Sequence, residues 1–448
     1  MSSIQLHPGD NRESLRRLID QGVRVHSVVT DPPYGLVSIQ KRFGKEGAKA
    51  ARTEKNDGSF ARLSGGFMGK AWDATGIERD PEFWKLIYDI LLPGGFVFAF
   101  SGSRTGHWQA CAMELAGFIM HPMHGWVFGS GFPKAHAADR AIDVALGRWN
   151  PRSKDEPYTP QSEEALAWEG WGHGTQTQKP ALEPIYLGQK PFSEKSGGAN
   201  LLAHGVGAFN IDGCRVPSAE SKVRASTAGD FGLLNDNGWQ PTPGQNGSEL
   251  GRHPANLILD GSPDVVAMFP ANAGASAPVK GTEPSGVTKD IYGKFAGRVP
   301  GTFFADSGSA ARFFHRFPPD MDPLFYHGKA AKADRAGSEH PTVKPIALMQ
   351  YLVRHITPPG GIVLDPFAGS GTTAEAAKRE GFDCILMEAE PEYVTFLEKR
   401  FDEKTAKNTF TVCSNFPKLG LHSYLSDFDD ILGAEHEEAI DDFADILG

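Results

Sequence analysis

Residues 362–373, IVLDPFAGSGTT, decide the fold of this chain. The apolar run Ile362–Leu364 predicts a buried strand, and a helix is expected to begin near Thr372. Glycines in the loop between them let the backbone approach a ligand closely, and the first turn of a helix has free N–H groups. The loop consists of Asp365, Pro366, Phe367, Ala368, Gly369, Ser370, Gly371 and Thr372.

The sequence on both sides of this loop predicts a βαβ unit. Upstream, apolar residues recur at helical spacing between Ile346 and Ile356, and the run 358–361, PPGG, ends that helix. Downstream, Gly381 ends the next helix and Cys384–Met387 is predicted as a strand. Glu388 follows this strand, where an acidic side chain commonly meets ribose hydroxyls in nucleotide-binding folds.

The loop sequence leaves two classes of ligand open. Gly369, Gly371 and Ala374 satisfy the G-x-G-x-x-A pattern of dinucleotide sites, so a nicotinamide dehydrogenase is one alternative. The Asp365 carboxylate, however, would repel a pyrophosphate but could hold the cationic amino group of a methionine moiety. The loop therefore favours S-adenosylmethionine as the cofactor.

The first 145 residues show alternating strand and helix patterns. Strands are predicted at Val25–Thr30 and Phe96–Phe100, and helices at Arg12–Ile19, with Asp10 as its cap, and at Phe83–Leu92. Such alternation is typical of an α/β fold in which helices cover both faces of a mostly parallel sheet.

The strand Val25–Thr30 leads into Asp31-Pro32-Pro33-Tyr34, the second stretch that suggests chemistry. An exocyclic amino nitrogen is a poor nucleophile because its lone pair is delocalised into the ring, so an enzyme must accept hydrogen bonds from it. The Asp31 carboxylate and the Pro32 carbonyl could supply both acceptors in fixed directions, and Tyr34 offers a face on which a flipped base can stack. An ordinary turn at the end of a strand is the alternative.

The middle of the chain differs from both ends. Residues 146–325 are rich in Gly, Pro, Ser and Asn, with short apolar islands at 182–187, 208–211 and 256–259. We expect an irregular insertion with long loops there, and a mobile loop at residues 36–70. The predicted organisation is a catalytic half, 1–145, an insertion with the target-recognition region, 146–325, a cofactor-binding half, 326–420, and an acidic tail, 421–448.

Charge and cysteine content set limits on partners. The net charge is −10, but the tail 421–448 holds nine acidic residues and no Lys or Arg, so the remainder carries only −1 and can bear a basic groove. Such a charge run is commonly a solvated tail. Because this tail repeats an acidic, aromatic and aliphatic unit, a partner-binding peptide and an intramolecular cover for a basic groove are the alternatives. The four cysteines form no metal-ligand spacing, which favours no metal and predicts small buried hydrophobes. No apolar run is long enough to span a membrane, so we expect a cytoplasmic protein.

Taken together, the two motifs resemble those of the site-specific DNA amino-methyltransferases, in the order that places D-P-P-Y before D-P-F-x-G-S-G. The stretch 340–345, HPTVKP, resembles the H-P-T-x-K-P motif of that family. Further resembling segments are 70–73, KAWD, 92–95, LPGG, 126–128, WVF, 179–185, KPALEPI, and 207–213, GAFNIDG. The resemblance implies a Rossmann-like methyltransferase fold that is interrupted by a long insertion.

The resemblance also assigns roles to residues. It implies that Asp31, Pro32, Pro33 and Tyr34 handle the target base, that the 365–372 loop cradles S-adenosylmethionine, and that Glu388 holds its ribose. Asp10 is expected near the adenine, with a plain helix cap as the alternative. Thr342 and Lys344 are expected beside the methionine end, although a surface lysine is an equal interpretation of Lys344.

The resulting hypothesis is methyl transfer to adenine N6 in double-stranded DNA, because the family more often pairs an initial Asp with adenine and an initial Ser with cytosine. Alternatives are cytosine N4, an RNA or protein amide substrate, and a DNA-binding regulator without activity. The absence of a Pro-Cys motif weighs against C5-cytosine methylation. The recognition sequence, the oligomeric state and the choice between a restriction-modification system, a phage and an orphan enzyme cannot be derived from the sequence.

Overall fold

The computed structural model describes residues 2–35, 75–131, 133, 135–149, 158–174, 177–218, 224–225, 245–246, 248–273, 308–317, 335–337, 343–401 and 409–412. The expected mobile loop at 36–70, the acidic tail 421–448 and Thr342 lie outside these residues.

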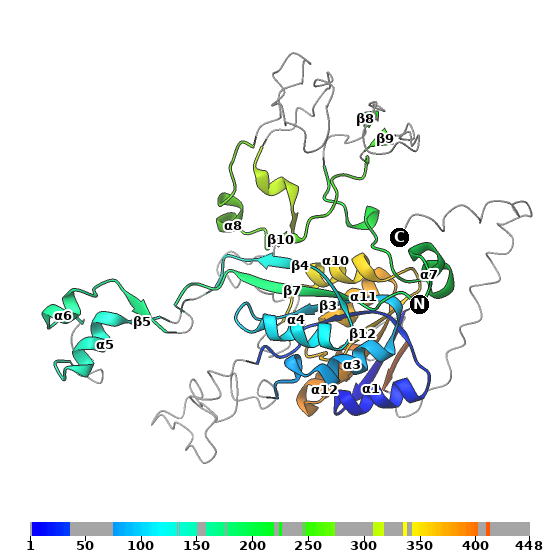
Figure 1. Cartoon of the computed structure of the whole chain (residues 1–448), viewed down its shortest axis with the longest axis horizontal. Coiled ribbons are helices and arrows are strands. Elements are labelled where there is room, and N and C mark those ends of the chain that lie inside the picture. The colour runs from blue at the N-terminus through cyan, green and yellow to red at the C-terminus, as the bar shows by residue number, and fades with distance from the viewer. Residues whose placement is uncertain are drawn as a thin grey trace, which may run out of the picture.

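A single large sheet organises the described part of the chain (Figure 1). Its ten strands follow the order β11-β10-β4-β7-β3-β2-β12-β13-β1-β14. Strand β7 is antiparallel to both of its neighbours, β3 and β4, and every other neighbouring pair is parallel, which confirms the mostly parallel α/β sheet. The strand bounds are β1 Ser3–Pro8, β2 Val25–Thr30, β3 Leu91–Phe100, β4 Ile119–Val127, β7 Leu182–Gln189, β10 Leu257–Leu259, β11 His315–Arg316, β12 Ile362–Asp365, β13 Asp383–Glu388 and β14 Thr409–Val412.

Helices cover both faces of this sheet, as predicted. Helices α10, α11 and α12 contribute to one buried cluster, whereas α1, α3 and α4 contribute to a second cluster on the other face. Neighbouring strand residues divide between them: Val29 belongs to the first cluster and Val28 to the second, because successive side chains of a strand point to opposite faces. The helix bounds are α1 Asn11–Asp20, α3 Pro81–Ile90, α4 Gly106–Leu115, α10 Ile346–Ile356, α11 Thr372–Glu380 and α12 Pro391–Phe401.

The elements predicted around the glycine-rich loop are confirmed almost to the residue. The apolar side of α10 is buried, α11 begins at Thr372, and Gly381 ends it with a φ of 83°, a left-handed conformation that glycine adopts without strain. The junction between α3 and β3 differs from the prediction. The helix ends at Ile90 and pairing with β2 resumes at once at Leu91, so Pro93-Gly94-Gly95 forms a bulge inside the strand.

The inserted middle region also contributes to the sheet. Its apolar islands at 182–187 and 256–259 fall in β7 and β10, which are strands of the central sheet rather than parts of a separate layer. The polar two-residue strand β11 extends the sheet beside β10. The predicted island at 208–211 forms no strand. The other short elements are η3 Ile77–Arg79, β5 His136–Ala137, α5 Ala138–Ala145, α6 Glu163–Leu166, β6 Gly172–His173, α7 Gly197–His204, η4 Asp212–Cys214, β8 Arg224–Ala225, β9 Gln245–Asn246, α8 Pro263–Ala267 and η5 Ala310–Phe313.

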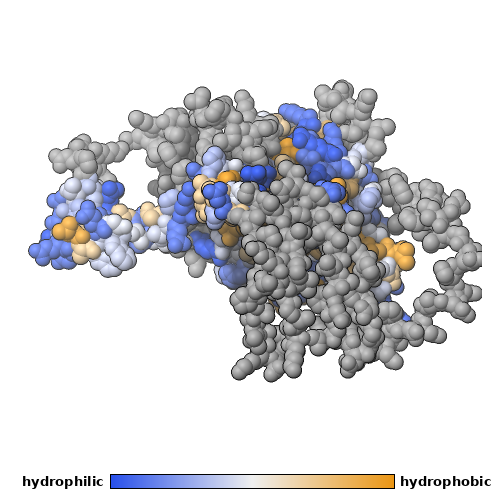
Figure 2. Space-filling model, turned by 90° about the horizontal axis from the view of Figure 1, so that it is seen from above, coloured by the Kyte–Doolittle hydropathy of each residue, from blue (hydrophilic) through white to orange (hydrophobic). Residues whose placement is uncertain are grey.

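A folded arm leaves the sheet between β4 and β7 and carries β5, α5, α6 and β6 (Figure 1). The space-filling view shows it standing away from the body, with hydrophobic side chains among hydrophilic ones (Figure 2). Its exposed large hydrophobic residues include Leu166, Trp168 and Trp171. We refer to residues 135–149 and 158–174 as the arm.

The cysteine prediction is only partly confirmed. Cys214 and Cys384 are buried, but Cys111 is exposed, because it lies on a part of α4 that does not face the sheet. Among the described residues, no helix is long and apolar enough to cross a membrane, and no group of three potential metal ligands is present.

Candidate active site

Four parallel strands, β2, β12, β13 and β1, lie side by side in the sheet and end at one edge. Their last residues are Thr30, Asp365, Glu388 and Pro8. Because the carboxyl ends of parallel strands meet there, the edge brings together residues that are far apart in the sequence. The two motifs therefore meet in space, as the sequence predicts.

A hydrogen bond between buried side chains joins the two motifs directly. Thr30 Oγ1 donates to Asp365 Oδ1 over 2.7 Å. Thr373 Oγ1 donates to Asp365 Oδ2 over 2.6 Å, and the Phe367 amide donates to Oδ1 over 3.1 Å. Burial raises the pKa of Asp365 to about 6, although these three donors oppose the shift. In this structure Asp365 therefore anchors its own loop to β2 and α11.

The Asp31 carboxylate has two unlike oxygens. Its Oδ2 accepts from Lys344 Nζ over 2.5 Å. Its Oδ1 is buried and has no donor within the described part of the chain. A buried acceptor without a donor costs about 1–3 kcal/mol, which singles out such an atom as a candidate ligand contact. The neighbouring Pro32 and Pro33 are buried.

The Tyr34 side chain is held at both ends. Its hydroxyl accepts from Lys344 Nζ over 3.1 Å and donates to Glu183 Oε2 over 3.1 Å. Its backbone carbonyl accepts from Thr105 Oγ1 over 2.6 Å. The next residue, Gly35, has a φ of 55°, and a Cβ there would lie 1.9 Å from the Glu78 side chain, so a larger residue would strain the backbone and displace Glu78. These contacts fix the position of the Tyr34 ring.

Two carboxylates share one ammonium group beside Tyr34. Lys344 Nζ lies 3.5 Å from Glu183 Oε2 as well as against Asp31. Burial raises the pKa of Asp31, Glu183 adds to the rise and Lys344 opposes it. Burial alone would lower the pKa of Lys344, but the carboxylates of Asp31 and Glu183 outweigh it, so this pKa lies above its usual value. Lys344 is therefore a buried cation.

Glu388 is the last residue of β13 and contacts the glycine-rich loop. Its Oε2 accepts from the Gly369 amide and its Oε1 from the Glu390 amide, both over 2.8 Å. Burial raises the pKa of Glu388 to about 7, against the effect of these amide donors. A carboxylate has about four lone-pair positions, so Glu388 keeps acceptor capacity beyond its backbone amide donors.

Asp10 immediately precedes α1, and its neighbour Gly9 contacts the backbone of Glu388. Its Oδ1 accepts from the Glu13 amide over 3.1 Å, so it caps the helix, and the preceding Gly9 amide donates to the Glu388 carbonyl over 2.8 Å. The cap therefore lies at the same edge of the sheet as the predicted cofactor residues. Asn11 ties this helix to the glycine-rich loop, because its side-chain amide donates to the Pro366 carbonyl over 3.1 Å.

The structure gives the partners of one predicted residue, Lys344, and adds a second residue to the site. Lys344, expected beside the methionine end of a cofactor, contacts Asp31 and Tyr34 of the other motif. Glu183 was missed as a site residue. Its signal in the sequence is that it is the single charged residue of the apolar strand β7, within the segment 179–185 that resembles the family.

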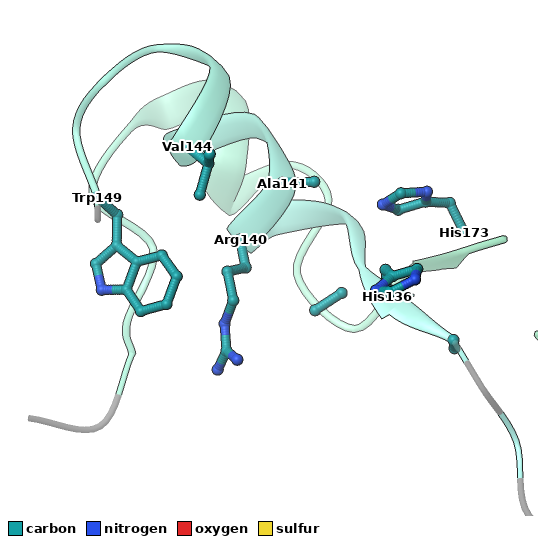
Figure 3. Close-up of a pocket in the computed structure, with 8 residues that line it drawn as sticks. His136, Arg140, Ala141, Val144, Trp149 and His173 are labelled. Carbon is teal, nitrogen blue, oxygen red and sulfur yellow. The ribbon is translucent and has the colours of Figure 1, made fainter. Parts of the chain in front are cut away.

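The arm contains a separate pocket of about 480 Å³ (Figure 3). Arg140 extends from α5, with Trp149 on one side and His136 on the other. The guanidinium carbon lies 5.0 Å from the ring centroids of both Trp149 and Tyr158. The His136 and His173 rings, with centroids 5.6 Å apart, come from the paired strands β5 and β6. The remaining lining residues are Ala135, Ala137, Ala141 and Val144.

Comparison with known proteins finds DNA methyltransferases among the relatives of this chain. A curated relative, the type II methyltransferase M2.DpnII of Streptococcus pneumoniae, is 39% identical over 77 residues, which is 17% of this chain and 29% of the relative. The chain thus matches less than a third of that relative's length.

Solved structures with a similar course include the M1.HpyAVI–SAM complex, with 16% identity, a TM-score of 0.36, and 89% of this chain and 99% of that chain covered. The cytosine-N4-specific PvuII DNA methyltransferase has 14% identity and a TM-score of 0.35, with 91% and 88% covered. The N6/N4 methyltransferase family model, described as DNA methylase, matches residues 25–399, which include both motifs and the insertion between them. The chain therefore belongs to this DNA methylase family.

Proposed function

We propose that the chain transfers a methyl group from S-adenosylmethionine to an exocyclic amino nitrogen of double-stranded DNA, with adenine N6 as the acceptor. The observation that carries the proposal is the state of Asp31: Lys344 occupies Oδ2, and the buried Oδ1 lacks a donor. An amino group donates hydrogen bonds and can supply what Oδ1 lacks.

The residues at the sheet edge fit S-adenosylmethionine. Glu388 has acceptor capacity for ribose hydroxyls, and the half-buried Phe367 offers an aromatic ring within the loop. Asp365 and Glu388 are both acidic, which favours a cationic ligand over a pyrophosphate. The oxygens of Asp365 already accept three protein hydrogen bonds, so a direct contact with the methionine amino group would use its remaining lone pairs.

When bound, S-adenosylmethionine supplies a methyl group on a positively charged sulfur. We propose that the target base leaves the helix and stacks on Tyr34, while its amino group donates to Asp31 Oδ1 and to the Pro32 carbonyl. The nitrogen–carbon bond forms as the carbon–sulfur bond breaks, and the nitrogen then loses a proton. Because the methylated nitrogen is strongly acidic, Asp31 need not be a strong base. Asp31 mainly orients the lone pair.

The geometry suits any exocyclic amino group. Adenine is preferred because the motif begins with Asp rather than Ser, and cytosine N4 remains the alternative substrate. We further propose that the inserted region supplies target recognition. The position of the arm supports this part of the proposal. The arm leaves the sheet at the end of β4 and returns at the start of β7, and Glu183 is the second residue of β7.

The direct test combines the purified full chain, duplex DNA and labelled S-adenosylmethionine, with identification of the methylated nucleoside. N6-methyladenine is expected, and N4-methylcytosine alone would overturn the choice of base. Methylome sequencing of an expressing host then gives the recognition sequence.

Asp31→Ala should lower kcat by about 100-fold or more, with cofactor affinity nearly unchanged, because it removes the acceptor of the reacting nitrogen. The matched control is Asp212→Ala, at an exposed aspartate in η4, which should retain activity. Undiminished transfer by Asp31→Ala would refute the role of Asp31.

A further inference from the structure

Glu183 lies in the one antiparallel strand within the central sheet. Strand β7 pairs Glu183 with Trp126 of β4, and Ile185 with Phe100 of β3. Glu183 is the only charged residue of β7, and its side chain is 7% exposed. Removing a carboxylate from water is costly unless charged or hydrogen-bonding partners compensate. A specific role at this position would explain why the strand carries it.

The contacts of Glu183 define that role. Its Oε2 accepts from the Tyr34 hydroxyl and lies 3.5 Å from Lys344 Nζ, which itself binds Asp31 Oδ2. Lys344 is thus held from two sides, and the second side comes from the inserted strand. With Asp31 and Glu183 ionised and Lys344 protonated, the cluster carries one net negative charge.

We propose that Glu183 is a positioning residue for methyl transfer: it holds Tyr34 and Lys344 so that Lys344 stays on Asp31 Oδ2 and Oδ1 remains available to the amino group. The proposal rests on the methyltransferase function proposed above. Positive charge moves from sulfur to nitrogen in the transition state, so a negative cluster at the nitrogen favours transfer over mere binding.

Glu183→Gln tests this role, because glutamine keeps the shape of the side chain and removes its charge. We expect kcat to fall on the order of 10- to 100-fold, since a misplacement of about 1 Å at a reacting group costs about that much. The KM for S-adenosylmethionine should stay within about twofold, because Glu183 does not belong to the cofactor loop.

The pH profile separates positioning from a structural effect. Glu183 helps to raise the pKa of Lys344, whereas burial lowers it. Without Glu183 that pKa falls, so the alkaline limb of kcat against pH should move to lower pH. Glu380→Gln is the matched control, because Glu380 pairs with Arg354 between α10 and α11 and should change stability while leaving kcat and the alkaline limb in place.

If Glu183→Gln does not fold, Glu183→Asp provides the alternative test. Aspartate keeps the charge but shortens the reach to the Tyr34 hydroxyl, so a reduced kcat with an unshifted alkaline limb is expected. A wild-type kcat for either folded variant, or an unshifted limb in Glu183→Gln, overturns the proposal. Absence of transfer by the wild-type chain would instead refute the proposed function.

Discussion

The hydrogen bond between Thr30 and Asp365 gives the sharpest stability prediction. Thr30→Val replaces the hydroxyl with a methyl group of similar size and leaves Asp365 two donors, Thr373 Oγ1 and the Phe367 amide. Both bonded residues are buried, with exposed fractions of 0% for Thr30 and 2% for Asp365, so water cannot readily replace the lost donor. Hydrogen bonds to charged groups contribute about 1.5–3 kcal/mol, and we expect a loss of unfolding free energy in that range at about pH 8.

Thr357→Val is the matched control. Thr357 Oγ1 is 2.8 Å from Ser27 Oγ, and this buried pair is neutral. The same substitution should therefore cost only about 0.5–1.5 kcal/mol. Urea unfolding of the full chain, with midpoint and slope recorded for both variants, measures the difference.

The pH dependence gives a second criterion for the same bond. Because Thr30 helps to keep Asp365 ionised, its removal raises the pKa of Asp365 further above about 6. When the pKa of a carboxyl group is raised in the folded state, the free energy of unfolding decreases as pH rises through that pKa. The difference in unfolding free energy between wild type and Thr30→Val should therefore grow between about pH 5 and pH 8. The reasoning would be refuted if Thr30→Val lost the same unfolding free energy at about pH 5 and about pH 8. It would also be refuted if Thr30→Val and Thr357→Val lost the same unfolding free energy at about pH 8.

Two further predictions concern the glycine-rich loop. Glu388 has a pKa raised to about 7 by burial and must be ionised to accept ribose hydroxyls well, so the Kd for S-adenosylmethionine should fall as pH rises through about 7. Titration calorimetry in two buffers should show proton release on binding by the wild-type chain and none by Glu388→Gln; equal release would contradict this role. Gly371→Ala should destabilise the fold by about 2–4 kcal/mol, because φ is 77° and the new Cβ would lie 2.6 Å from Leu397. Gly381→Ala, at a φ of 83° with no atom within 4 Å, should lose only about 1–2 kcal/mol in urea unfolding, and a similar loss in both variants would show that the Leu397 contact is not limiting.

The sequence predicted the elements whose signals are local. Helix α11 begins at Thr372 and ends before Gly381, and the glycines that flank it adopt left-handed conformations. Both glycines can be recognised in the sequence. The helix predicted at Phe83–Leu92 instead ends at Ile90, because Leu91 pairs with Val25 on another strand. Pairing between strands that are far apart in the sequence cannot be predicted from a short segment of either strand.

The candidate site was predictable to a similar degree. The motif residues Asp31 and Asp365 were recognisable because each follows a predicted strand. The contact of Lys344 with Asp31 joins positions 313 residues apart, and that of Glu183 with Tyr34 joins positions 149 apart. Both depend on the strand order of the sheet, and above all on β7 lying between β3 and β4, which sequence patterns do not specify.

The place of β7 has a consequence for engineering new sequence specificity. A graft that exchanged the whole of residues 146–325 would also remove the strand that bonds β3 to β4, together with the Glu183 carboxylate. The donor segment would then have to rebuild part of the catalytic sheet. Cutting within the arm instead, between the end of β4 and the start of β7, leaves both strands with the host. In this chain, the segment that can be exchanged is therefore shorter than the inserted region 146–325, because part of that region belongs to the proposed active site.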